Sequence, residues 1–198
     1  PLWVADMDFV SARPIIDAIH ERAEFGILGY GWPPRALRQV IQERLQRLYN
    51  WTVGEEEILF LPGLVPGLNL TYHAFSKPGE AVLVQPPVYF HFVSDPPAHG
   101  RLLQDPPLVP SGDSYEIDLE AFEASITERT RVFLLCNPHN PVGRVFTRQE
   151  LTTLAGICLR HNIVICADEI HCDLLYPGYR HVPIATLGPE VAARTVTL

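Results

Sequence analysis

The sequence is almost without lysine: 14 of its 15 basic residues are arginines, and Lys77 is the single lysine. The basic residues are scattered rather than gathered into a patch interleaved with aromatic residues, and the net charge at pH 7 is −8. A nucleic-acid-binding protein typically carries such a basic patch. We therefore expect no nucleic acid as the main partner.

Long apolar runs are also missing. The most apolar stretch, residues 59–70, is interrupted by two prolines and two glycines, whereas a membrane-spanning helix needs about 20 consecutive apolar residues. We expect no association with a membrane. The first residues lack the basic region and apolar core of a secretory signal. Trp3 and Val4 are typical of the middle of an extended segment, so we expect further residues upstream.

Metal-binding cysteine motifs are absent. The four cysteines have no C-x-x-C spacing: Cys136, Cys158, Cys166 and Cys172. His171 beside Cys172 could be imagined as a ligand pair, but zinc sites built from cysteine usually need a second close pair. We expect no metal site, and reduced, buried thiols in a cytoplasmic protein.

What the sequence does contain is an alternation of strand-like and helical segments. The 198 residues, 47% of them hydrophobic, suffice for one well-buried domain but not for two large ones. Expected strands are residues 58–61, 81–84, 101–103, 132–136, 163–167 and 195–198. Expected helices begin at Pro14, after Pro34, at Val65, after Asp118 and after Thr147, where Glu150 completes a capping box. The proline-rich residues 86–110 are expected to be irregular. This alternation predicts an α/β fold of three layers, α/β/α, with a mostly parallel sheet.

Polar or glycine-rich sequences follow three of the expected strands, at residues 62–65, 137–143 and 168–171. Ligands of parallel α/β sheets bind at the carboxyl ends of the strands. Asp168 follows a strand that is expected to be buried, where a carboxylate is costly unless it meets a positive partner. A lone aspartate there would be interpreted as a capping or ion-paired residue. Asn140, held between two prolines, is expected at the same edge of the sheet.

These motifs resemble those of a known family. NPHNPVG followed by ADEIH resembles the fold-type I aminotransferases, which depend on pyridoxal 5'-phosphate (PLP). The segments WVADMDF, LGYG, PGLVPGLNL and QPPVYFHF resemble the branch of cystathionine β-lyase-like C–S lyases. The resemblance runs from residue 3 to at least residue 183, with several motifs in the same order. It implies the large domain of an aspartate aminotransferase-like PLP enzyme.

The resemblance also implies roles around the cofactor ring. Asp168 would pair with the protonated pyridine nitrogen, which agrees with the physical argument for a positive partner. Asn140 would hydrogen-bond the phenolic oxygen. His171 would approach the same oxygen, although a histidine satisfied at the wall of the site is an alternative. Tyr89 would stack on the ring, unless it is an ordinary core aromatic.

Phosphate and substrate contacts follow from the same resemblance. Gly63, Leu64 and Val65 would bind the phosphate through backbone N–H groups at a helix start. Tyr30 would reach the phosphate of the neighbouring subunit, which implies a homodimer with shared active sites. Ala5 and Asp6 would lie near the substrate carboxylate.

The family bonds its cofactor to a lysine that follows a further strand. Lys77 precedes the strand expected at residue 81, so it lies on the opposite side of the sheet and cannot serve. We expect that lysine just after Leu198, and therefore a sequence that is truncated at both ends and contains no catalytic residue of its own. Residues 1–28 would belong to a small domain and linker, and residues 29–198 to the N-terminal part of the PLP-binding large domain.

The function favoured by these motifs is cleavage of sulfur amino acids, such as cystathionine, to a thiol, pyruvate and ammonia. An aminotransferase would use the same cofactor contacts. A third possibility is an inactive fragment or a non-catalytic PLP-binding regulator, because the lysine is absent. We expect the 198 residues alone to be inactive.

Overall fold

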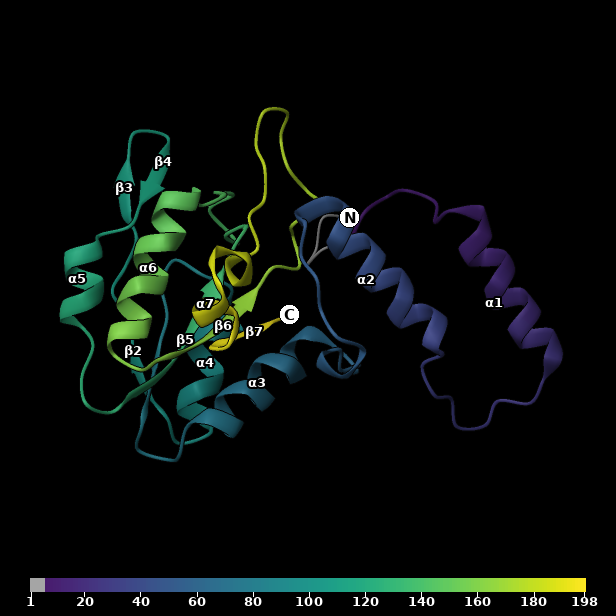
Figure 1. The fold of residues 1–198 in the computed structure, drawn as a ribbon, viewed down its shortest axis with the longest axis horizontal. Helices are drawn as coiled ribbons and strands as arrows, with labels where there is room; N and C mark the ends of the chain where they lie inside the picture. The colour runs from purple at the N-terminus through teal and green to yellow at the C-terminus, as the bar shows by residue number, and fades with distance from the viewer. Residues whose placement is uncertain (1–5) are drawn as a thin grey trace. The chain divides into compact units, whose positions relative to one another are not determined.

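The computed structural model describes residues 6–198 (Figure 1). The chain divides into two compact units, one of residues up to 38 and one of residues 39–198, and the division falls inside helix α2 (Arg35–Tyr49). None of the helices in the described part of the chain combines the length and the apolar character required to cross a bilayer.

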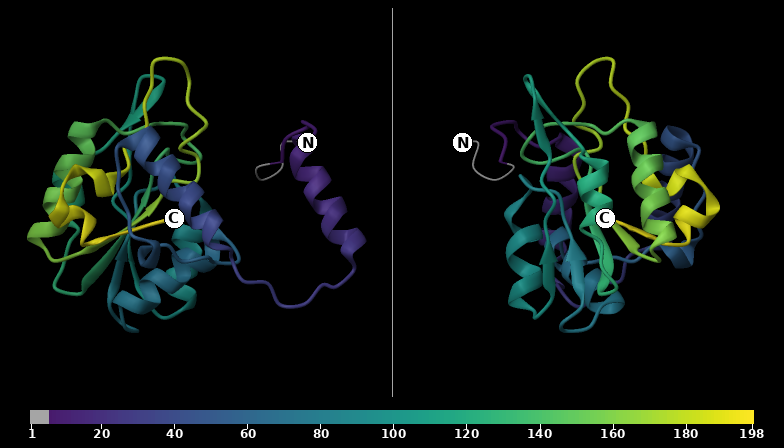
Figure 2. Two further views of the ribbon diagram at one scale, coloured as in Figure 1. Left: turned by 45° about the vertical axis from the view of Figure 1, so that its right-hand side comes forward. Right: turned by 90° about the vertical axis from the view of Figure 1, so that its left-hand side faces the viewer.

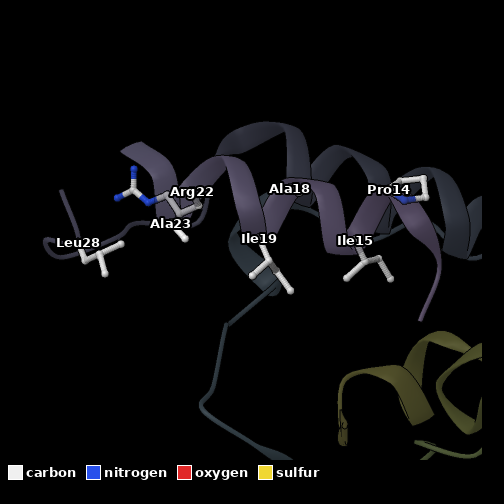
Figure 3. A pocket seen from close by; sticks show the side chains of 7 residues that line it. All are labelled: Pro14, Ile15, Ala18, Ile19, Arg22, Ala23 and Leu28. Atoms are coloured by element: carbon white, nitrogen blue, oxygen red, sulfur yellow. The ribbon is translucent and has the colours of Figure 1, made fainter. Parts of the chain in front are cut away.

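The first unit contains helix α1 (Arg13–Phe25), which begins with Pro14 in its first turn and ends at Gly26, whose φ is 72°. This confirms the helix expected at Pro14. None of its residues is buried. Its apolar side chains and Leu28 line a shallow depression, where Ile15 and Ile19 project from the same side of the helix (Figure 3).

The second unit is built on a parallel sheet of five strands. Their spatial order is β2 (Leu102–Gln104), β1 (Ala81–Leu83), β5 (Thr130–Cys136), β6 (Val164–Asp168) and β7 (Thr195–Thr197). Every neighbouring pair is parallel. Five of the six expected strands are therefore confirmed; β5 is the middle strand, and β5 and its neighbour β6 are the longest.

Helices cover both faces of this sheet (Figure 2). Along β5, Val132 and Leu134 are buried in one core with residues of α3 (Leu64–Phe75) and α4 (Phe90–Ala98). Phe133 and Leu135 are buried in a second core with residues of α5 (Leu119–Ala124), α6 (Arg148–Arg160) and α7 (Pro189–Ala192). Successive residues of a strand point to opposite faces. The fold is thus the three-layer α/β/α arrangement expected from the sequence.

Residues 86–110 are more regular than expected. They contain helix α4, strand β2 and the beginning of a hairpin of β3 (Val109–Ser111) and β4 (Ser114–Glu116). Prolines usually end a helix, yet α4 includes Pro96 and Pro97 in its last turn. Phe92 and Pro96 are buried in this helix, so tertiary packing outweighs the low helix propensity. Two short 3₁₀ helices, Glu55–Glu57 and Ile184–Leu187, complete the described elements.

One expected strand is wrong. Residues 58–61 form no strand, and no segment of the described chain pairs with them. A strand is defined by the ladder of hydrogen bonds to a neighbour, and an apolar run alone does not supply that neighbour. Leu59 is 80% exposed, so the run does not form part of the core either.

Helix α6 begins with the capping box predicted from the sequence. The Thr147 hydroxyl accepts a hydrogen bond from the Glu150 N–H at 3.2 Å, and the Glu150 carboxylate accepts one from the Thr147 N–H at 2.8 Å. We expect Thr147→Ala to lower the free energy of unfolding by about 1 kcal/mol, since one N–H at the helix start loses its acceptor. Urea denaturation measures this loss. Thr153→Ala, in the exposed part of the same helix, is the control, and equal stability of the two variants would contradict the prediction.

Candidate functional site at the carboxyl edge of the sheet

The two central strands bring two of the predicted polar segments together. Asp168 is the last residue of β6, and it lies in register with Cys136, the last residue of β5. The next residue, Asn137, donates its N–H to the Asp168 carbonyl oxygen at 3.0 Å. The segments of residues 137–143 and 168–171 therefore lie side by side at the carboxyl edge of the sheet, as the sequence predicted.

Asp168 is a buried carboxylate, 3% exposed. Its Oδ1 accepts a hydrogen bond from the Ile170 N–H at 3.1 Å, and no ion pair links it to any residue in the described part of the chain. Burial raises the pKa of Asp168 to about 6, opposed by the Ile170 hydrogen bond and by His171. A carboxylate in such a place is costly without a positive partner. The site is therefore suited to a cationic group of a ligand.

Internal hydrogen bonds fix the loop of residues 137–143. The Asn137 side-chain oxygen accepts from the Phe146 N–H at 2.9 Å, and His139 Nε2 donates to the Pro87 carbonyl oxygen at 3.0 Å. Burial lowers the pKa of His139. The Asn140 N–H donates to Cys136 Sγ at 3.3 Å. These bonds hold the backbone of Asn140 at a defined place beside the strand ends.

Asn140 and His171 line a common cavity of about 700 Å³. Its walls are the loop that carries Asn140, the turn of the β3–β4 hairpin and residues 171–179. The structure thus brings together two of the side chains predicted to approach the phenolic oxygen of the cofactor. Asp168 and Tyr89 are not among the residues that line this cavity.

The start of α3 lies at the same edge. Gly63 is its N-cap residue, and no side chain caps the helix. A Cβ atom on Gly67, in the first turn, would lie 2.8 Å from a methyl group of Leu198. The Leu198 carbonyl oxygen in turn accepts from the Glu169 N–H at 3.0 Å, so the first turn of α3 lies near the residue that follows β6. The first N–H groups of a helix and its dipole favour an anion. Leu64 and Val65, the first two residues of α3, supply such N–H groups near the end of β6.

Tyr89 precedes α4 as its N-cap residue and packs, partly buried, against the core formed with α3. Its ring centroid lies 4.9 Å from that of Phe90 and 5.2 Å from that of His91. This packing is what an ordinary core aromatic would show, so its stacking on a cofactor stays a prediction.

The remaining predicted residues belong to other segments of the chain. Asp6 and Tyr30 belong to the first unit and are exposed, and Ala5 lies outside the described residues. Lys77 is exposed in the turn between α3 and β1, where its N–H donates to the Glu80 carboxylate at 2.8 Å. That turn leads into the amino end of β1, so Lys77 is on the opposite edge of the sheet from Asp168, as expected.

Sequence reasoning missed a second buried carboxylate at this edge. Glu169 and His181 are each 6% exposed, and His181 Nε2 lies 2.9 Å from Glu169 Oε2. The adjacent carboxylates of ADEIH could have predicted this second buried group. Neighbouring residues after a buried strand point in opposite directions, so Glu169 needs a partner separate from that of Asp168.

The cysteines are free thiols. Burial raises the pKa of three of them to about 12: Cys136, Cys158 and Cys166. Within residues 6–198, no group of three or more His, Cys, Asp or Glu side chains is arranged to hold a metal ion.

Comparison with known proteins identifies the family. Residues 8–198 match the family model described as aminotransferase class I and II. The chain belongs to the class I and II aminotransferase family, whose members depend on PLP. It is 39% identical over its whole length to cystathionine beta-lyase PatB of Bacillus subtilis (strain 168), of which it covers 51%. It is 34% identical to arginine–pyruvate transaminase AruH of Pseudomonas aeruginosa, of which it covers 50%.

Solved structures agree with this assignment. A PLP-bound putative aminotransferase from Clostridium difficile 630 is 39% identical and superposes with a TM-score of 0.95, with 100% of this chain and 51% of that chain covered. Cystalysin from Treponema denticola, which contains PLP, is 30% identical with a TM-score of 0.94, and 50% of it is covered. The chain spans about half the length of the relatives it matches.

Proposed function

We propose that the full-length protein is a PLP-dependent C–S β-lyase, which cleaves a sulfur amino acid of the cystathionine type to a thiol, pyruvate and ammonia. The main support for PLP as the cofactor is Asp168. It is a buried carboxylate without a cationic partner in the described chain, and it lies at the carboxyl edge of a parallel sheet. The similarity to cystathionine beta-lyase PatB and to cystalysin supports the lyase reaction.

The residues of the candidate site fit this cofactor. Asp168 would hold a proton on the pyridine nitrogen, and Asn140 and His171 would hydrogen-bond the phenolic oxygen. When bound, PLP supplies an electron sink for bond cleavage at the substrate Cα. By keeping its own negative charge beside the nitrogen, Asp168 favours the protonated ring that accepts those electrons.

The helix start would hold the phosphate. The N–H groups of Leu64 and Val65 are not capped by a side chain, and Gly63 lets the anion approach the backbone. Tyr89 would cover one face of the ring. Ala5 and Asp6 would lie near the substrate carboxylate.

The catalytic lysine, which would remove the Cα proton as general base, is proposed to lie outside these residues. Lys77 is exposed on the edge of the sheet opposite Asp168. We further propose that residues 1–28 belong to a small domain and linker, and residues 29–198 to the large domain. The apolar face of α1, which has no buried residue, supports a role in packing against a further domain.

A homodimer with shared active sites is part of the same proposal. Tyr30, whose side chain is fully exposed, would reach the phosphate bound by the partner subunit. An aminotransferase is the second candidate, since the chain is 34% identical to a transaminase over its whole length.

The products of L-cystathionine decide between these functions. With PLP and no added 2-oxo acid, we expect the full-length protein to release one thiol for each pyruvate and ammonia. Lys77→Arg should have the activity of the wild type, because Lys77 lies away from the site. Turnover that needs a 2-oxo acid and yields no thiol would identify an aminotransferase. PLP binding without turnover would identify a regulator, and β-elimination by residues 1–198 alone would contradict their expected inactivity.

A further inference from the structure

Glu169, at the carboxyl edge of the sheet, forms hydrogen bonds through both its backbone and its carboxylate. Its N–H donates to the Leu198 carbonyl oxygen at 3.0 Å, and its carbonyl oxygen accepts from the Cys172 N–H at 2.9 Å. Its carboxylate accepts from His181 Nε2 at 2.9 Å and from the Ile184 N–H at 3.0 Å. Glu169 thus bonds the residue that follows β7, and it also bonds residues at the start and just beyond the end of the segment 170–180.

The segment between these contacts, residues 170–180, is mostly exposed. Its own backbone bonds are local turns, from Leu174 to His171 and from Tyr179 to Tyr176. Two side-chain bonds tie this segment to α2: an exposed ion pair between Asp173 and Arg44, and a hydrogen bond between Cys172 and Tyr49. The bonds from the Glu169 carboxylate to His181 and to the Ile184 N–H hold the end of the segment. His171 lies inside this closed segment and lines the cavity that it shares with Asn140.

Stability alone does not account for a buried carboxylate–imidazole pair here. Replacing a buried polar pair by apolar residues of similar volume is often neutral or stabilising, because the polar groups must be desolvated. Within residues 6–198 the buried Nδ1 of His181 also has no hydrogen-bond partner, which adds to the cost. The pair does restrain the position of the segment that carries His171. Glu169 follows Asp168 directly and is held by its backbone hydrogen bonds, and its carboxylate holds the far end of that segment through His181.

We propose that Glu169 and His181 are positioning residues, which close the segment of residues 170–180 and thereby hold His171 at the cofactor's phenolic edge. This inference rests on the proposed function, because it assigns the pair to the same cofactor site. Tyr49 of α2 packs its ring edge-on against that of His181, with centroids 5.8 Å apart, so the histidine ring has a second contact besides Glu169.

The test uses the full-length protein and four variants: H181A, E169A, E169Q and D173N. E169Q keeps an acceptor for the Ile184 N–H and a polar partner for His181, whereas E169A loses both bonds. D173N removes the exposed ion pair of the same segment and is the matched control. If H181A fails to fold, His181→Phe fills the space without the hydrogen bond.

Two measurements distinguish how firmly residues 170–180 are held from how tightly PLP is bound. Hydrogen exchange of the protein without PLP should show faster exchange in residues 170–180 of H181A and E169A. Titration with PLP should show an affinity about tenfold weaker, the lower end of the loss that is typical when a residue that orients a metal ligand is removed. E169Q and D173N should stay close to the wild type in both measurements.

A double-mutant cycle then asks whether the pair acts through His171. In the H171A background, H181A should cause little further loss of PLP affinity, because positioning residues are not additive with the group they position. The inference is overturned if exchange rises while PLP affinity stays unchanged, or if the loss persists in full without His171. A wild-type protein that binds no PLP would overturn the proposed function itself and this inference with it.

Discussion

Asp168→Asn should lower kcat of the PLP-loaded, full-length protein by roughly 10²- to 10⁴-fold. Removing one partner of a buried charge pair typically costs about 3–5 kcal/mol, and each 1.36 kcal/mol corresponds to about a tenfold change in rate. Asparagine keeps the shape of the side chain and the hydrogen bond from the Ile170 N–H. It cannot keep a charge beside the pyridine nitrogen, so the ring would lose its ability to accept electrons.

Steady-state kinetics with L-cystathionine measures this loss, and binding of PLP to the variant is followed by absorption. Asp173→Asn is the control, since Asp173 is exposed and paired with Arg44. A loss of activity of less than about tenfold would be smaller than the loss expected for breaking a buried charge pair, and it would show that Asp168 has another role.

The same substitution should stabilise the protein when no cofactor is bound. Burial raises the pKa of Asp168 from 3.8 to about 6 in the folded state, so the folded protein binds this proton more tightly than the unfolded chain. The ionised side chain therefore destabilises the fold, and stability is lost as pH rises from about 4 to about 6. At about 1.36 kcal/mol per pKa unit, the cost above that range is about 3 kcal/mol, and Asp168→Asn should recover most of it.

Urea denaturation of the cofactor-free protein at pH 7 and pH 4 provides the measurement. At pH 7 the variant should be the more stable protein, and at pH 4 the difference should largely vanish. With PLP bound, the order at pH 7 should reverse, because the wild type gains the binding free energy. A variant that is less stable than the cofactor-free wild type at pH 7 would contradict the prediction.

The periodicity of the sequence predicted the central part of the fold well. Residues 132–136 and 163–167 are continuous apolar runs, and such runs are typical of strands covered on both faces. Because both strands are parallel neighbours, the polar residues that follow them meet at one edge. The sequence pattern alone was therefore enough to place Asp168 beside the loop of Asn140.

What the sequence did not reveal depends on contacts between distant residues. Helix α4 contains two prolines and is formed because Phe92 is buried against the sheet. The run of residues 58–61 has the composition of a strand and no neighbour to pair with. The Glu169–His181 bond joins residues twelve positions apart across an irregular segment, and no periodic pattern marks such a pair.

Two thiols lie close to Asp168: Cys136 is its register partner on β5, and Cys166 precedes it by two residues on β6. A cysteine side chain can add to an aldehyde to form a hemithioacetal, and the thiolate is the reactive nucleophile. Burial raises the pKa of both thiols to about 12, so at neutral pH they keep their protons. The two buried thiols beside Asp168 are therefore poor nucleophiles toward an aldehyde, including that of the cofactor proposed to bind at this edge.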